Sequence, residues 1–263
     1  MPSETAVYPT TLGMEKENVV ESRARRSEAG PWPRAAGWQR AAGRSWPSRQ
    51  AAPVVSPAFQ KQYEEELGAV RQAYPRTQLW HQGDGVWLLS KSAVLDGLRQ
   101  HAIFLTGISF AWSMVRSWAY WSAPLALPVW IGPRHTNFFD GSICAFEPTD
   151  GTWGFGDSLV ELLDLYTVWA LRHLHLQIFG RWPGYQAVHY PVERLLELRE
   201  DEYCGCGMTG KMYGECCKAK DAAKSRVADA VQFALSPRRP PGSVTKAVRT
   251  GDAPPLLANL LSD

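Results

Sequence analysis

The sequence predicts an α+β fold in which a four-stranded antiparallel meander has helices packed on one side. Three observations favour it: an amphipathic segment comes first, short apolar runs separated by turn residues follow, and a long helical repeat comes after a loop. Helices and strands in separate stretches are typical of this class. The 263 residues, 45% of them hydrophobic, suffice for one domain with extensions or for two small domains.

The first predicted element is a helix that begins at Ser56 and Pro57, a cap followed by proline at the first helical position. Its apolar residues recur at helical spacing and form one stripe, and Pro75 ends it. The stripe comprises Phe59, Tyr63, Leu67, Val70 and Tyr74.

Four apolar runs, rich in aromatic and aliphatic residues, are predicted to be the strands. They are Val86–Leu89, Ala102–Phe110, Val115–Trp121 and Leu125–Ile131. Periodicity alone leaves a buried helix open as an alternative. Nine of the twelve tryptophans lie between Trp80 and Trp182, which places the core there because large aromatic side chains bury the most apolar area.

Helices are predicted after the loop at 132–157. Ser158 and Glu161 have the spacing of a capping box, and the helical repeat continues to about Phe179. Pro191 starts a helix that runs to about Glu202, and a short amphipathic helix is expected at Asp221–Leu235.

The sequence divides into four parts. Residues 1–55 are predicted to be a disordered basic extension, 56–202 the main domain, 203–220 a cysteine knuckle, and 221–263 a C-terminal helix with a flexible tail. Residues 51–217 carry a net charge of −5 between arms of +3 and +4. Basic arms suit nucleic acid or an acidic protein partner, but charge on a tail commonly serves only solubility.

Cysteine usage favours a reducing, cytoplasmic location. The chain has five cysteines, an odd number that would leave an unpaired thiol in a secreted protein. Residues 1–30 lack the apolar segment of a signal peptide. The most apolar stretch, 102–133, lacks the roughly twenty uninterrupted apolar residues of a membrane span, so no membrane partner is expected.

Four cysteines crowd into fourteen residues: Cys204, Cys206, Cys216 and Cys217. Four thiolates on a glycine-rich segment satisfy tetrahedral Zn²⁺ and leave no open position, which indicates structural zinc. Two disulfides or free thiols are the alternatives. The Cys-x-Cys pair, the Gly-Lys-x-Tyr core and the final Cys-Cys pair resemble the SEC-C zinc motif, although the central gap is one residue longer. That resemblance implies a protein docking partner and a bacterial source.

Cys144 lies apart from the others, among turn-forming residues. A thiol acts as a nucleophile through its thiolate, with an ordinary pKa of about 8.5, and a partly exposed loop suits that role. The alternative is a small buried hydrophobe beside Ile143 and Phe146. A cysteine protease would also need a general-base histidine, and nothing in the sequence places His173, His175 or His189 beside the thiol.

The segment around Cys144 resembles the active site of ubiquitin-conjugating enzymes. That family has His-Pro-Asn followed by Gly-Ser-Ile-Cys-Leu, and here the residues are His135-Thr136-Asn137 and then Gly141-Ser142-Ile143-Cys144-Ala145. Trp153, ahead of the next helix, also fits. Threonine replaces the family's proline, and the interval from asparagine to cysteine is one residue shorter.

The resemblance implies a ubiquitin-conjugating-like fold and a ubiquitin-like modifier carried as a thioester on Cys144. It implies an activating enzyme, a ubiquitin-like protein and a protein target as partners. Asn137 would stabilise the oxyanion, a contribution of about 3 kcal/mol, or would only shape the turn. His135 would support the loop, and Asp150 or Asp157 would replace the family's acidic residue.

Two other functions stay open. One is a ubiquitin-conjugating-like adaptor with an inert Cys144, favoured by the missing proline and acidic residue. The other is a nucleic-acid-binding adaptor that uses the basic arms, against which the acidic central region argues.

Overall fold

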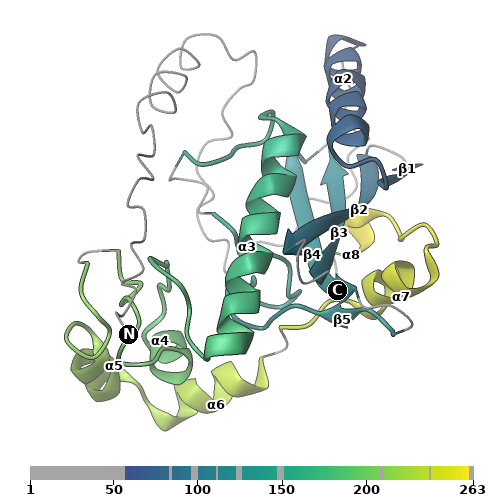
Figure 1. Cartoon of the computed structure of the whole chain (residues 1–263). Helices are drawn as coiled ribbons and strands as arrows, with labels where there is room; N and C mark the ends of the chain where they lie inside the picture. The colour runs from purple at the N-terminus through teal and green to yellow at the C-terminus, as the bar shows by residue number, and fades with distance from the viewer. Residues whose placement is uncertain are drawn as a thin grey trace, which may run out of the picture. The chain divides into compact units, whose positions relative to one another are not determined.

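The computed structural model describes residues 57–82, 85–95, 100–110, 112–122, 126–146, 151–207, 210–236 and 238–260, all within one compact unit. The predicted extension 1–55, the predicted cap Ser56 and the candidate acidic residue Asp150 lie outside them. The strands are β1 (Gln78–Gln82), β2 (Gly85–Leu95), β3 (Gln100–Ser109), β4 (Met114–Ser122) and β5 (Val129–Trp130). The helices are α2 (Pro57–Ala73), α3 (Leu159–Phe179), α4 (Pro191–Glu197), α5 (Lys218–Lys224), α6 (Val227–Leu235), α7 (Gly242–Thr250) and α8 (Leu257–Leu260) (Figure 1).

The sheet is an antiparallel meander of five strands in chain order, β1 to β5. The α+β class and the meander are therefore confirmed, but the predicted number of four strands is wrong. The additional strand is β1, whose short sequence carries only two half-buried apolar residues, Leu79 and Trp80, and so gives a weak strand pattern. At the other edge, only Val129 and Trp130 of the predicted fourth run pair with β4.

Helices α2 and α3 cover one face of the sheet. Both were predicted, and α3 ends at Phe179 as expected. The predicted capping box at Ser158 is absent, because that side chain makes no cap hydrogen bond. The Leu159 amide instead donates to Glu66 Oε2 of α2 at 2.9 Å, so a tertiary contact caps α3. The buried side chains of this layer include Val70, Leu88, Phe104, Ala119, Leu162, Leu163 and Trp169.

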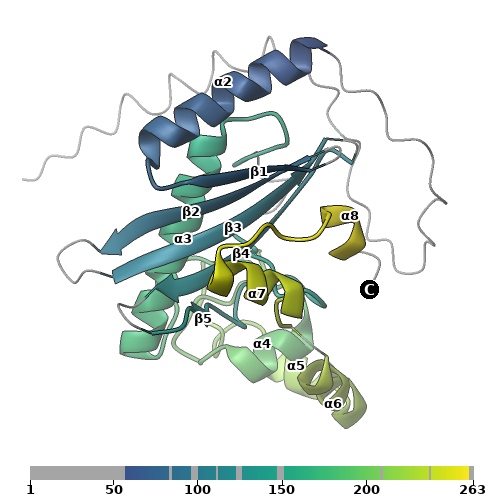
Figure 2. The same cartoon turned by 90° about the vertical axis from the view of Figure 1, so that its right-hand side faces the viewer.

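Helices α7 and α8 cover the opposite face, in front of the sheet in Figure 2. The prediction that helices lie on one side is therefore wrong. Side chains alternate between the two faces of a strand, and Trp87, Trp118 and Tyr120 are large apolar groups on the second face that must also be buried. The stretch predicted to be a flexible tail supplies that cover, through Val244, Ala247, Val248 and Leu257.

The helices around the cysteine knuckle are shorter than predicted. Helix α4 stops at Glu197 rather than near Glu202, because Leu198 adopts an extended conformation. The single helix expected at Asp221–Leu235 is two helices, α5 and α6, since Ser225 and Arg226 between them are extended. None of the described helices combines the length and the apolar character that crossing a membrane requires.

Candidate functional site

Residues 134–146, here called the Cys144 loop, follow β5 and are held by backbone hydrogen bonds. The Ile143 amide donates to Ser117 O of β4 at 2.7 Å, which ties the loop to the sheet. Within the loop, the Asn137 amide donates to Ser142 O (2.7 Å) and the Cys144 amide to His135 O (3.0 Å). The backbone around the cysteine is therefore fixed by both local and tertiary contacts.

Cys144 forms no disulfide with the other cysteines, all of which the structure describes, and has intermediate exposure. Its predecessor Ile143 is buried in the first core layer, and its successors Ala145 and Phe146 pack against the same layer. The thiol is thus neither sealed in the core nor displayed on a projecting turn. A partly exposed thiol on an anchored loop is compatible with a nucleophile.

Asn137 lies inside the loop with its side chain already engaged. The Nδ2 amide group donates to Ser142 Oγ and to Ile143 O, both at 3.0 Å. These bonds join the two halves of the loop directly before Cys144. The geometry therefore favours the loop-shaping role over that of an amide free to meet an oxyanion.

His135 is a supporting residue in the structure. Its Nε2 lies 3.0 Å from Gln186 Oε1, and its ring lies 4.1 Å from the Trp182 ring, centroid to centroid. Burial, and then the adjacent Arg134, lower its pKa to about 4. A neutral, buried imidazole holds the loop in place and is poorly suited to exchange protons near neutral pH.

Thr136 occupies the position where the resembled family has proline. Its hydroxyl donates to Pro133 O at 2.5 Å, and its backbone forms an isolated bridge with Ile143. The threonine thus closes the turn by hydrogen bonding. Of three non-glycine residues with positive φ in the described parts of the chain, two lie in this loop, His135 at 50° and Phe139 at 73°. Backbone strain of this kind concentrates at functional sites.

The remaining candidates have local roles. Asp157 Oδ2 accepts from the Gly154 amide at 2.7 Å and shapes the turn before α3. His173 is buried against Trp169 and Trp182, where burial, and then His135, lower its pKa to about 3. The partly buried His175 has its Nδ1 3.0 Å from Arg181 O. These contacts give the three side chains structural roles.

A buried ion pair that the sequence did not reveal supports the base of the loop. Arg134 donates from Nη1 to Glu202 Oε1 (2.9 Å) and from Nη2 to Glu202 Oε2 (2.8 Å), while Gln186 Oε1 also accepts from Nη2 (2.9 Å). The two partners are 68 residues apart. No spacing rule connects them, although an arginine beside the His-Thr-Asn segment was a visible signal.

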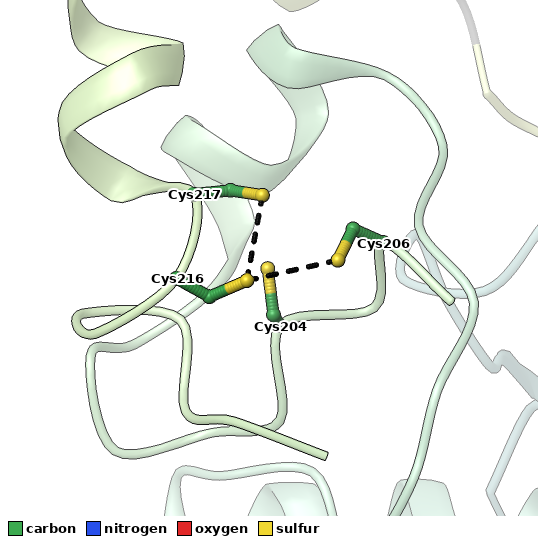
Figure 3. A group of neighbouring side chains, drawn as sticks. All are labelled: Cys204, Cys206, Cys216 and Cys217. Carbon is green, nitrogen blue, oxygen red and sulfur yellow. Dashed lines mark hydrogen bonds between the residues drawn. The ribbon is translucent and has the colours of Figure 1, made fainter. Parts of the chain in front are cut away.

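The four knuckle cysteines, here called the cysteine cluster, converge on one point (Figure 3). Their sulfurs all lie within 4.8 Å of one another, and none is in a disulfide. Cys216 Sγ lies 3.8 Å from Cys206 Sγ and 3.7 Å from Cys217 Sγ. Tetrahedral ligands at the usual Zn–S distance would be about 3.8 Å apart, so the cluster can hold a metal ion and its spacing fits zinc.

The local structure fixes the positions of these four cysteines. Cys204 is fully buried with Val188, Leu198 and Tyr213. Gly205 has φ of 70°, and a Cβ there would lie 3.0 Å from the Val188 nitrogen, so glycine is required. Burial, and then contacts with the other thiols, raise the pKa of Cys204. Four adjacent thiolates are therefore unfavourable without a cation between them.

Comparisons of the chain with protein-family models, with curated proteins and with solved structures found no match.

Proposed function

We propose that the chain is a ubiquitin-conjugating-like enzyme, which carries a ubiquitin-like modifier as a thioester on Cys144 and transfers it to an amine of a target protein. The observation that carries this proposal is a partly exposed cysteine, outside any disulfide, on an anchored loop with positive-φ backbone. The loop follows a helix and an antiparallel meander and precedes a long helix. The resembled family has the same order of elements and the corresponding residues before its cysteine.

The proposed chemistry has two steps. The Cys144 thiolate attacks the carbonyl carbon of a modifier thioester on an activating enzyme; a bond to the Cys144 sulfur forms, and the activating enzyme's thiolate leaves. A neutral amine of the target then attacks the same carbon, the bond to the Cys144 sulfur breaks, the Cys144 thiolate is released, and the proton lost from the nitrogen passes to solvent. Asn137 holds the loop, since stabilising the oxyanion would require its amide to give up an existing bond.

Zinc is the metal proposed for the cysteine cluster. Cys204, Cys206, Cys216 and Cys217 would complete its tetrahedral shell, so the ion would contribute folding energy and no reaction chemistry. In this proposal the knuckle is a structural module, which resembles SEC-C motifs that dock on other proteins.

The proposal is tested by charging the protein. The chain is incubated with ATP and pairs of activating enzymes and ubiquitin-like modifiers, and the products are separated on non-reducing gels. We expect an adduct that dithiothreitol removes, a dithiothreitol-resistant ester with Cys144→Ser, and no adduct with Cys144→Ala. An adduct that persists in Cys144→Ala would refute the assignment of the thiol.

One observation favours a second candidate, a binding adaptor with an inert thiol. The side chains that the resemblance places at the reaction, Asn137 and His135, are both committed to structural contacts. An adaptor would bind the modifier or its activating enzyme with equal affinity in the parent and in Cys144→Ala, and would never form the adduct.

A further inference from the structure

The Cys144 loop lies between the sheet and the cysteine knuckle, and the knuckle fixes residues that bind the start of the loop. The Tyr213 amide donates to Glu202 O at 2.7 Å, and Gln186 Nε2 donates to Tyr203 O at 2.8 Å, so Glu202 and Gln186 are fixed by the knuckle's own fold. Both side chains bind Arg134, and Gln186 also contacts His135. One set of buried polar contacts thus runs from the knuckle to the start of the loop.

A second set of contacts connects the knuckle to α4. Cys217 is the residue before α5, and Asp221 of α5 receives two hydrogen bonds from Arg194 of α4, each 2.8 Å long. Arg194 also donates to the carbonyl groups of Val188 (2.7 Å) and His189 (2.9 Å). Arg194 and Asp221 are both buried, so the position of α4 depends on α5.

Helix α4 in turn holds the tip of the loop through Arg238. This buried arginine pairs with Glu193 (3.4 Å) and Glu197 of α4, and its guanidinium lies 5.0 Å from the centre of the Phe138 ring. Burial and the neighbouring Glu197 raise the pKa of Glu193 to about 7 despite this pairing, so burial outweighs the attraction of Arg238. The backbone of residue 238 also forms a bridge with Phe139.

The segment that contains Arg238 also contacts the loop backbone at Gly141, shortly before Cys144 in the sequence. A Cβ on Gly141 would lie 2.9 Å from the carbonyl carbon of Arg239, so the segment at 238–239 presses directly on the loop. On the other side, the sheet's Trp118 Nε1 donates to Asp140 O at 2.7 Å. The loop is therefore clamped from two sides, and one of these sides depends on the knuckle.

We infer that Arg134 and Arg238 are positioning residues that couple the cysteine cluster to the Cys144 loop, so that metal loading of the cluster fixes the loop conformation in which Cys144 reacts. The inference rests on the proposed function for the identity of the reacting thiol. The coupling would act through the contacts above. A folded knuckle holds Glu202 and α4 in place, and these in turn hold Arg134 and Arg238 against the loop. Loss of the metal would release both at once.

The test measures hydrogen exchange of single backbone amides in the full chain, and so needs no modifier. The reporters are the amides of Asn137, Gly141 and Cys144, which donate within the loop, and the references are core amides of β3 and β4. Metal-loaded parent is compared with Arg238→Ala and with Arg239→Ala. The second variant is the matched control, because it alters the exposed neighbouring side chain and leaves the backbone contact in place.

We expect Arg238→Ala to accelerate exchange at the loop amides roughly tenfold or more, with unchanged metal content and reference amides, and Arg239→Ala to change nothing. Chelation of the parent should accelerate the same amides, and should add less in Arg238→Ala because one of the two links, that through Arg238, is already broken. Unchanged loop exchange on chelation, or equal acceleration of loop and sheet, would overturn the inference. Either result would leave the charging test of Cys144 unaffected.

Discussion

The two cysteine regions of this chain are built in different ways. In the cysteine cluster all four ligands lie within fourteen residues, and two glycines with positive φ, Gly205 and Gly207, turn the chain between them. The Cys144 loop takes its shape from distant parts of the chain, because Ser117 of β4, Trp169 of α3, Gln186 and Arg238 all contact it. A cysteine cluster that could hold a metal can thus be predicted from local spacing, whereas the surroundings of Cys144 require the fold.

The largest expected effect comes from substituting one cysteine in each of the two regions and comparing the two variants. Cys204→Ser should lose the metal and lower the free energy of unfolding by on the order of 5 kcal/mol, since structural zinc contributes about 10 kcal/mol or more in zinc-finger peptides. Cys144→Ser, the control, should keep both its metal content and its stability. Metal analysis and denaturant unfolding measure these effects, and a Cys204→Ser chain with parental values would show that the cluster holds no structural metal.

The next effect comes from comparing the loss of a buried ion pair at the base of the loop with the loss of an exposed ion pair. Arg134→Ala should cost about 3 kcal/mol, because it leaves the buried Glu202 carboxylate without its main partner. Arg199→Ala removes an ion pair with the exposed Asp201 and should cost far less, because solvent screens that pair. Guanidinium unfolding compares the two, and similar costs would contradict the assigned role of Arg134.

A smaller effect concerns the histidines beneath the loop. The pKa values of His135 and His173, about 4 and 3, lie below their ordinary 6.5. At these two residues the unfolded chain therefore binds more protons below about pH 6.5, and their contribution to stability falls as the pH drops through this window. The loss approaches about 1.4 kcal/mol per pH unit for each histidine.

The pH effect is measured as the difference between parent and His173→Phe from pH 7 to 5, which cancels the opposite contribution of Glu193. The variant should lose stability less steeply than the parent. Parallel curves for parent and His173→Phe would mean that His173 is not buried in its neutral form.

The sequence predicted the parts of the fold in which apolar residues recur at a regular local spacing. Helices α2 and α3 and the central strands follow from apolar spacing, and their layer contains most of the core. Helix α7 was missed because only Val244, Ala247 and Val248 of its nine residues are apolar, too few to indicate a buried helix after a proline-rich break. Its packing on the second face of the sheet depends on tertiary contacts with the cluster that contains Trp118 and Tyr120.

The candidate site shows the same limit. Spacing brought together the four cluster cysteines, and the resemblance to ubiquitin-conjugating enzymes pointed to Asn137 and Cys144, which the structure places in one loop. It could not show that the Asn137 amide is already bonded, nor that Arg134 and Glu202 pair in the interior. Such contacts depend on tertiary distances, which no local pattern contains.

The central claim is that Cys144 is the open, reactive thiol and that the cluster thiols are closed around a metal. Timed alkylation of the metal-loaded protein with iodoacetamide, followed by peptide mass spectrometry, compares all five cysteines in one sample. We expect Cys144 to be modified first, with the four cluster cysteines protected until a chelator is added. Modification of any cluster cysteine before Cys144 would contradict the claim.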